Sequence, residues 1–64
     1  MSVANLEAYA LSQGITTAYQ NMDQASQAIL RYNYLMSVTG DAQGDFARTS
    51  GKQQLPRLIE ILGQ

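Results

Sequence analysis

The sequence predicts an all-α protein, and three observations carry that prediction. Apolar or small residues recur at alternating spacings of four and three from Ala4 to Met36, which is a helical period. A stretch rich in Gly and Asp follows at residues 40–54, and a short segment with one apolar face ends the chain. We therefore expect a single small domain, residues 1–64, with a long helix at about 3–38, a loop at 40–54 and a short C-terminal helix at about 56–63. The expected shape is a helical hairpin or rod packed in an assembly.

The prediction of a long helix rests on this regular row of apolar and small residues, which we call the seam. Spacings that alternate four and three without a slip are those of the a and d positions of a helix packed along its length against another. At 1.5 Å per residue such a helix would be about 50 Å long. The seam therefore predicts interface residues, which are Leu11, Ile15, Ala18, Met22, Ala25, Ile29, Tyr32 and Met36.

Gly14 is the weak point of the long helix. Glycine costs about 1 kcal/mol inside a helix and is common just past a helix end. The run "TAYQ", Thr17 to Gln20, could also be a capping box that opens a second helix. Because the seam keeps its phase through Gly14, we favour one continuous helix, with two helices as the alternative.

The C-terminal segment predicts a helix that docks. Gly40 is placed to cap the long helix, Phe46 to anchor the loop onto it, and Pro56 to occupy the first turn of the second helix. A helix of about ten residues is unstable alone and must pack on something, either its own long helix or a neighbouring copy. Its predicted contact face consists of Leu55, Leu58, Ile59 and Leu62.

The composition predicts that contacts with protein partners stabilise so small a fold. The 64 residues include no Cys and no His, which removes disulfides and nearly all structural zinc sites. Charged residues are 14% of the chain, against about 25% in ordinary soluble domains. The uncharged stretch "AYALSQGITTAYQNM", residues 8–22, suits helices packed by copies of themselves, because a buried charge would need a partner at every interface.

The same composition argues against several functions. Residues Gly44, Gly51 and Lys52 have the wrong spacing for a phosphate-binding loop, and Asp41 with Asp45 are too few for a calcium loop. Without His, and with isolated carboxylates, no nucleophile and base can be paired. We therefore predict no enzyme, no catalytic or metal-binding residue and no cofactor. The net charge of −1 supplies no basic surface for nucleic acid.

Charge is also divided along the chain. Residues 1–46 carry four acids and one Arg, a net charge of −3, whereas residues 47–64 carry three basic residues and one Glu, a net charge of +2. The division either arose by chance or lets the tail meet the acidic part of its own chain or of a neighbour. Arg31, alone on an uncharged helix, is either a solvated charge or a specific partner for Asp23, Asp41 or Asp45.

The N-terminal residues lack a secretory signal. "MSVANLEAYALSQ" has no basic segment followed by an apolar run, and no stretch approaches the roughly 20 apolar residues of a membrane-spanning helix. We expect no stable membrane association, and a location in the cytoplasm or export by a route that needs no such signal.

In composition the chain resembles the small subunits of bacterial type III secretion needles, which are Cys-free helical hairpins rich in Ala, Gln and Ser. Their proline-bearing turn is replaced here by "TGDAQGD". The run "LSQGITTAYQNMDQASQA" is similar to the Ala/Gln-rich helix of R-body proteins. Both families form polymers, so the resemblance implies a bacterial homopolymer.

The sequence thus leads to a non-enzymatic, self-assembling helical protein, the subunit of a filament, ribbon or sheath, whose partners are copies of itself. An alternative is a small adaptor, chaperone or inhibitor that binds another protein through its long helix. A membrane-active peptide is the third and least favoured reading.

Overall fold

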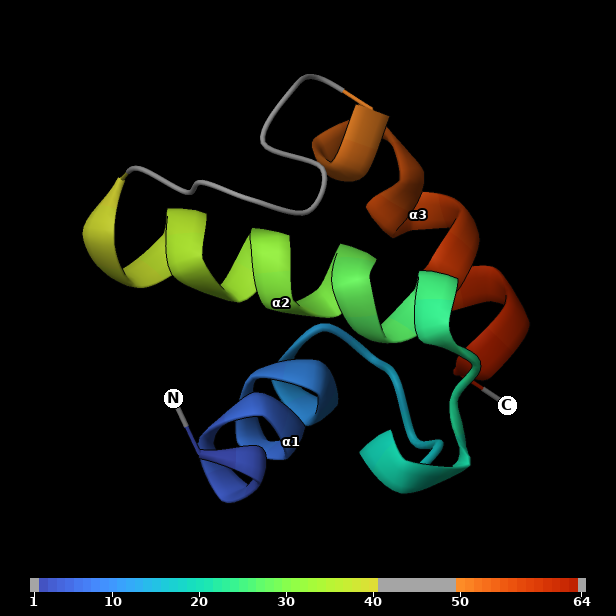
Figure 1. The fold of residues 1–64 in the computed structure, drawn as a ribbon. Coiled ribbons are helices and arrows are strands. Elements are labelled where there is room, and N and C mark those ends of the chain that lie inside the picture. The colour runs from blue at the N-terminus through green and yellow to red at the C-terminus, as the bar shows by residue number, and fades with distance from the viewer. Residues whose placement is uncertain (1, 41–49, 64) are drawn as a thin grey trace.

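The computed structural model describes residues 2–40 and 50–63, with the side chains of α3 described from Gln53 onward. Within these ranges the chain forms the helices α1 (Val3–Ser12), α2 (Gln24–Thr39) and α3 (Ser50–Leu62), with a 3₁₀ turn η1 (Tyr19–Asn21) between the first two and no strand. The helices α1 and α3 lie on different sides of α2 (Figure 1). The all-α class is confirmed, with a long helix and a shorter C-terminal one.

Local hydrogen bonds fix both ends of α1. At its start, the Ser2 hydroxyl accepts a hydrogen bond from the Asn5 N–H at 3.1 Å, which satisfies one of the free amides of the first turn. At its end, Gly14 has φ +95°. The Gly14 N–H donates to the Leu11 carbonyl at 3.0 Å, and the Ile15 N–H donates to the Ala10 carbonyl at 2.8 Å. This pair of bonds is a Schellman motif, which terminates a helix.

The predicted continuous helix over residues 3–38 is therefore wrong at its centre. Residues 13–23 leave the α-helix, and the longest dimension of the fold is 28 Å, not the roughly 50 Å that a continuous helix would have. The alternative of two helices is correct, although not through the "TAYQ" capping box. Ala18 precedes η1 without a side-chain cap, and the second helix begins only after Asp23.

The second helix is capped at both ends. The Asp23 carboxylate accepts a hydrogen bond from the Ser26 N–H at 2.9 Å. Hydrogen bonds from the side chain and the backbone of Ser26 hold the pKa of Asp23 below its usual value. At the other end, Gly40 adopts φ +73° and its N–H donates to the Met36 carbonyl at 3.0 Å. The predicted end of the helix at Gly40 is confirmed.

The third helix begins earlier than expected. It starts at Ser50, so Pro56 lies inside it instead of in its first turn, and the predicted loop at 40–54 is shorter at its C-terminal end. The residues before the proline include Lys and Gln, which favour helix and extend it upstream. Pro56 itself is exposed, and its missing N–H removes one bond of the helix. The predicted anchor Phe46 lies outside the described residues.

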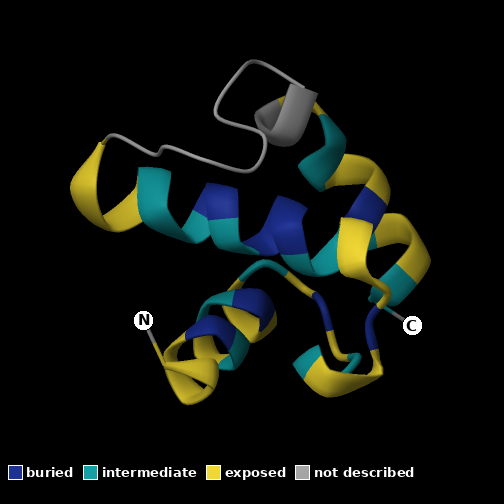
Figure 2. Ribbon diagram, in the orientation of Figure 1, coloured by how far each residue is buried: buried dark blue, intermediate teal, exposed yellow. Residues whose placement is uncertain are grey.

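The core draws on all three helices and on the segment between α1 and α2 (Figure 2). Leu30 and Ile15 are its largest fully buried side chains, at 0% and 1% exposure. Ile15 and Met22 belong to the non-helical segment, yet both point into this cluster. The buried members of the cluster are Leu6, Ala10, Ile15, Met22, Ile29, Leu30 and Leu58.

Residues 16–17 join the end of α3 to the rest of the fold. The carbonyl of Leu62 accepts hydrogen bonds from the N–H groups of Thr16 at 3.0 Å and Thr17 at 3.3 Å, and from both threonine hydroxyls. A carbonyl in the last turn of a helix has no partner within the helix, so these bonds satisfy it. The predicted docking of the C-terminal helix takes place on its own chain.

The dimensions are those of a closed globule. The radius of gyration is 10.4 Å, close to the roughly 10.7 Å expected for a globular domain of this length. A rod does not have these dimensions, so the predicted rod is also corrected. The chain covers much of its own apolar surface, and any assembly would be built from subunits that are already folded.

Candidate functional site

The structure divides the predicted interface residues into three groups. Many of them lie in the core of the single chain, where a second copy cannot reach them without unfolding. The buried ones are Ile15, Met22, Ile29, Tyr32 and Leu58; the half-buried ones are Ala18, Met36, Leu55, Ile59 and Leu62; the exposed ones are Leu11 and Ala25.

Three exposed residues of the seam lie on the outer face of α1. Ala4, Ala8 and Leu11 follow one another at spacings of four and three, so they share one side of the helix, and all three are exposed. Leu11 is 62% exposed, and Val3 beside this row is 51% exposed. We call these four residues the α1 outer face. It is apolar, and nothing in the described part of the chain covers it.

The only ionisable group of α1 besides the phenol of Tyr9 is Glu7, and it has a structural task. A carboxylate oxygen of Glu7 accepts a hydrogen bond from the Tyr19 N–H at 2.8 Å. On the other side of η1, the Gln27 amide donates to the Tyr19 carbonyl at 3.0 Å and the Arg31 guanidinium donates to the Tyr19 hydroxyl at 2.8 Å. The turn η1 is thereby held to both α1 and α2.

This arrangement around Tyr19 was not foreseen from the sequence. Arg31 is half-buried and donates a hydrogen bond to a tyrosine hydroxyl, so it is not a purely solvated charge. Its candidate partners Asp41 and Asp45 lie outside the described residues. The sequence holds no periodic signal for such a contact, because it joins residues in a 3₁₀ turn to residues in two separate helices.

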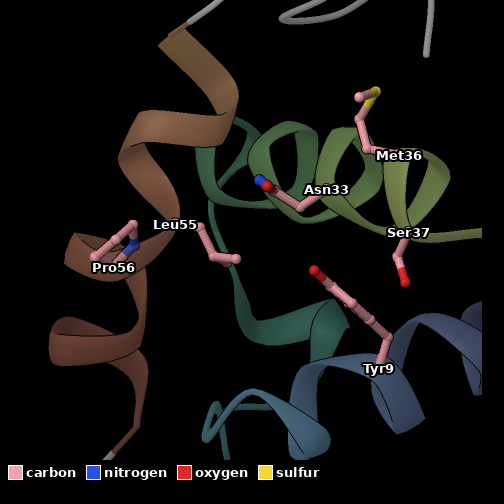
Figure 3. A pocket seen from close by; sticks show the side chains of 6 residues that line it. All are labelled: Tyr9, Asn33, Met36, Ser37, Leu55 and Pro56. Atoms are coloured by element: carbon pink, nitrogen blue, oxygen red, sulfur yellow. The ribbon is translucent and has the colours of Figure 1, made fainter. Parts of the chain in front are cut away.

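A groove lies where the three helices meet (Figure 3). Its volume is about 400 Å³, which is within the range of ligand pockets. Tyr9 of α1 and Leu55 of α3 point into it from either side, below Asn33 of α2 (Figure 3). We call it the three-helix groove, and its lining residues are Tyr9, Asn33, Met36, Ser37, Leu55 and Pro56.

The chemistry of the three-helix groove is that of a neutral surface. Burial raises the pKa of the Tyr9 hydroxyl, so this group stays protonated at neutral pH. The Tyr9 ring also meets the Tyr34 ring edge to face, with centroids 5.7 Å apart, which fixes its orientation. The buried Asn33 amide donates to the Ile29 carbonyl at 2.8 Å. Since none of the described residues that line it is charged, these residues are suited to an apolar group and not to a phosphate or a carboxylate.

The described residues offer neither a metal centre nor a membrane-spanning helix. Residues 2–40 and 50–63 contain no group of three side chains placed to hold a metal ion. Within the same part of the chain, no helix has both the length and the apolar character needed to cross a bilayer. The candidate calcium-loop and phosphate-loop residues, Asp41, Asp45 and Gly44, fall outside it.

Comparisons of the chain with protein-family models, with curated proteins and with solved structures give no match. The candidate surfaces therefore rest on geometry alone, and they are the α1 outer face and the grooves beside α2.

Proposed function

We propose that this protein is a non-enzymatic helical structural protein that associates with copies of itself into a homopolymer such as a filament, ribbon or sheath. The observation that carries the proposal is the α1 outer face, a set of exposed apolar side chains on one side of a helix in a chain that otherwise buries its core.

Physical chemistry favours covering this face. Full burial of a Leu side chain contributes about 1.5–3 kcal/mol, and Leu11 retains most of its surface in the single chain. Ala4 and Ala8 are exposed and small, so the axis of a second helix can come close to α1 between the larger side chains. Another helix can therefore pack against the part of the seam that is exposed on α1.

The measurement that tests the proposal is the size of the pure protein. Light scattering after size-exclusion chromatography, over a range of concentrations, should give a mass well above the 7.0 kDa of one chain, and negative-stain microscopy should find regular particles. Leu11→Asp should return the protein to one chain with unchanged helical circular dichroism, because Leu11 lies outside the core cluster.

Asn5→Asp is the matched control. Asn5 is also exposed on α1 but is not part of the α1 outer face, so it receives the same new charge without altering the proposed contact. It should assemble as the unaltered protein does. A mass of one chain at every concentration, or an unchanged particle in Leu11→Asp, would refute the proposal.

The adaptor alternative is supported by a different observation, the three-helix groove. Its neutral and largely apolar lining can take an apolar side chain of a partner protein. On that reading the pure protein stays a single chain, and Leu55→Asp in the groove, not Leu11→Asp on α1, removes partner binding in a pull-down from the source cells.

A further inference from the structure

We infer that the copies join head to tail, with the α1 outer face of one copy seated in a groove between α2 and α3 of the next. This inference rests on the self-assembly proposed above and specifies its geometry. It concerns a second groove, separate from the three-helix groove.

The second groove has an apolar floor. Ile29 of α2 and Leu58 of α3 line it and are 6% and 4% exposed. Its rims carry Ala25 from α2 and Ile61 from α3, and Ile61 is 59% exposed. The volume is about 180 Å³. We call it the α2/α3 groove.

The two surfaces match in shape and polarity. A helix is convex, and Leu11 projects from the α1 outer face with 62% of its surface free. The α2/α3 groove is concave, and a large exposed isoleucine borders it. Inserting Leu11 would cover apolar surface on both copies at once, because Ile61 would pack against the arriving helix. Ala4 and Ala8 would let the rest of α1 lie close to the rims.

The two surfaces also match in charge. Glu7 lies between Val3 and Leu11 on α1 and is the one acid of this helix, and its second carboxylate oxygen can still accept hydrogen bonds. Among the described residues that line the α2/α3 groove, Arg57 is the charged one, and it makes no hydrogen bond or ion pair with the described part of the chain. The acid nearest the groove along the chain is Glu60 of α3, directly before Ile61, and it has an interaction of its own.

A contact between two different surfaces has a geometric consequence. An interface of one surface with itself closes a dimer, whereas an interface of unlike surfaces repeats until a ring closes or a filament grows. Since α1 and α3 pack on different sides of α2 (Figure 1), one copy can use both surfaces at the same time. Pairing of two α1 outer faces would bring two Glu7 carboxylates together instead, and it could not propagate.

The contact is small, which sets the conditions of the experiment. A ten-residue helix is about 15 Å long, and its outer side covers much less than the roughly 800 Å² per partner of a stable interface. Each contact should therefore be weak, and assembly should depend steeply on concentration. We suggest measuring from about 10 µM, where weak contacts of this size are broken, to about 1 mM, where they form.

The test uses two variants that each destroy one surface. Leu11→Asp removes the α1 outer face and leaves the groove, and Ile61→Asp removes the groove and leaves the α1 outer face. Both residues are exposed, so circular dichroism should report a folded protein in each case. Each variant alone should remain a single chain at concentrations where the unaltered protein assembles. Mixed in equal amounts, they should form a species of two chains that grows no further.

Each outcome decides something. A two-chain species in the mixture supports the head-to-tail contact. If Ile61→Asp alone assembles as the unaltered protein does, or if the mixture stays at one chain, the head-to-tail contact is overturned while self-assembly stands. If the unaltered protein is one chain throughout, the proposed function fails as well. Should either Asp variant lose its circular dichroism, Leu11→Ser and Ile61→Ser replace the pair with smaller changes.

Discussion

Gly14 has a backbone conformation that decides the course of the chain. Its φ of +95° lies in the region that other L-residues enter only at a cost. There is space at the position, since an added Cβ would meet Ile59 Cγ2 at 3.6 Å, an ordinary contact distance. The preference for glycine therefore comes from the backbone angle and not from crowding.

Gly14→Ala should destabilise the protein by roughly 1–2 kcal/mol, because alanine must adopt the left-handed conformation. For a domain of this size, each kcal/mol lowers the melting temperature by about 4–8 °C, which a thermal scan by circular dichroism would resolve. Gly14→Asn is the control, and its loss should be smaller because Asn tolerates this region better. A gain in stability from Gly14→Ala would mean that the helix does run through this position.

The same residue explains where sequence reasoning succeeded and where it failed. Gly14 is the weak point of the predicted long helix, but the unbroken seam favours a continuous helix through it. The spacing of the seam predicts a helix along its whole length. Ile15 and Met22 keep this spacing, but they lie outside any α-helix and point into the core. Apolar spacing reports burial, and burial alone does not show that the backbone between two residues is helical.

At the scale of the element, the ends of α2 follow from short-range chemistry. Asp23 and Gly40 each satisfy backbone groups within a few residues, and such contacts are readable from sequence. The docking of α3 followed from its apolar face, but that face left open whether α3 docks on its own chain or on a neighbouring copy. The start of α3 at Ser50 was not predicted. Proline is favoured in the first turn of a helix, so Pro56 was expected there.

The Asp23 cap should make the stability of α2 depend on pH. Because the pKa of Asp23 is lowered in the folded state, its contribution is complete above the unfolded-state value and is lost as the pH falls through the folded-state value. Asp23→Asn keeps a capping oxygen but cannot ionise. The difference in unfolding free energy between the two proteins should therefore shrink as the solution is acidified below about pH 4. A constant difference in denaturant titrations would contradict this role of the charge.

At the scale of the whole molecule, a small core leaves little reserve. A domain of this length has a total stability of roughly 3–10 kcal/mol. Leu58 is 4% exposed and joins α3 to the core cluster. It is one of few large residues that do so, so the cohesion of the three helices depends strongly on it.

Leu58→Ala should cost about 2–5 kcal/mol, as truncation of a buried leucine usually does, and should unfold much of the population at moderate denaturant. Leu11→Ala makes the same chemical change on a helix but at an exposed site, so it should alter the stability of the single chain by less than about 0.5 kcal/mol. Equal losses in the two variants, measured below the concentration of assembly, would show that the core is not organised as described.

The hydrogen bonds from residues 16–17 to Leu62 also bear on the order of folding. They join positions 46 and 45 residues apart, and closing a loop of that length costs roughly 3 kcal/mol of chain entropy before any contact is gained. Local helices form within about a microsecond, so we expect α1 and α2 to be present in the folding nucleus and α3 to join late. Contacts that form late govern the unfolding rate. The lifetime of the native state would then be set by how firmly Leu62 is held. The amide protons of Thr16 and Thr17 should exchange with solvent at the same rate as the amide protons of α3.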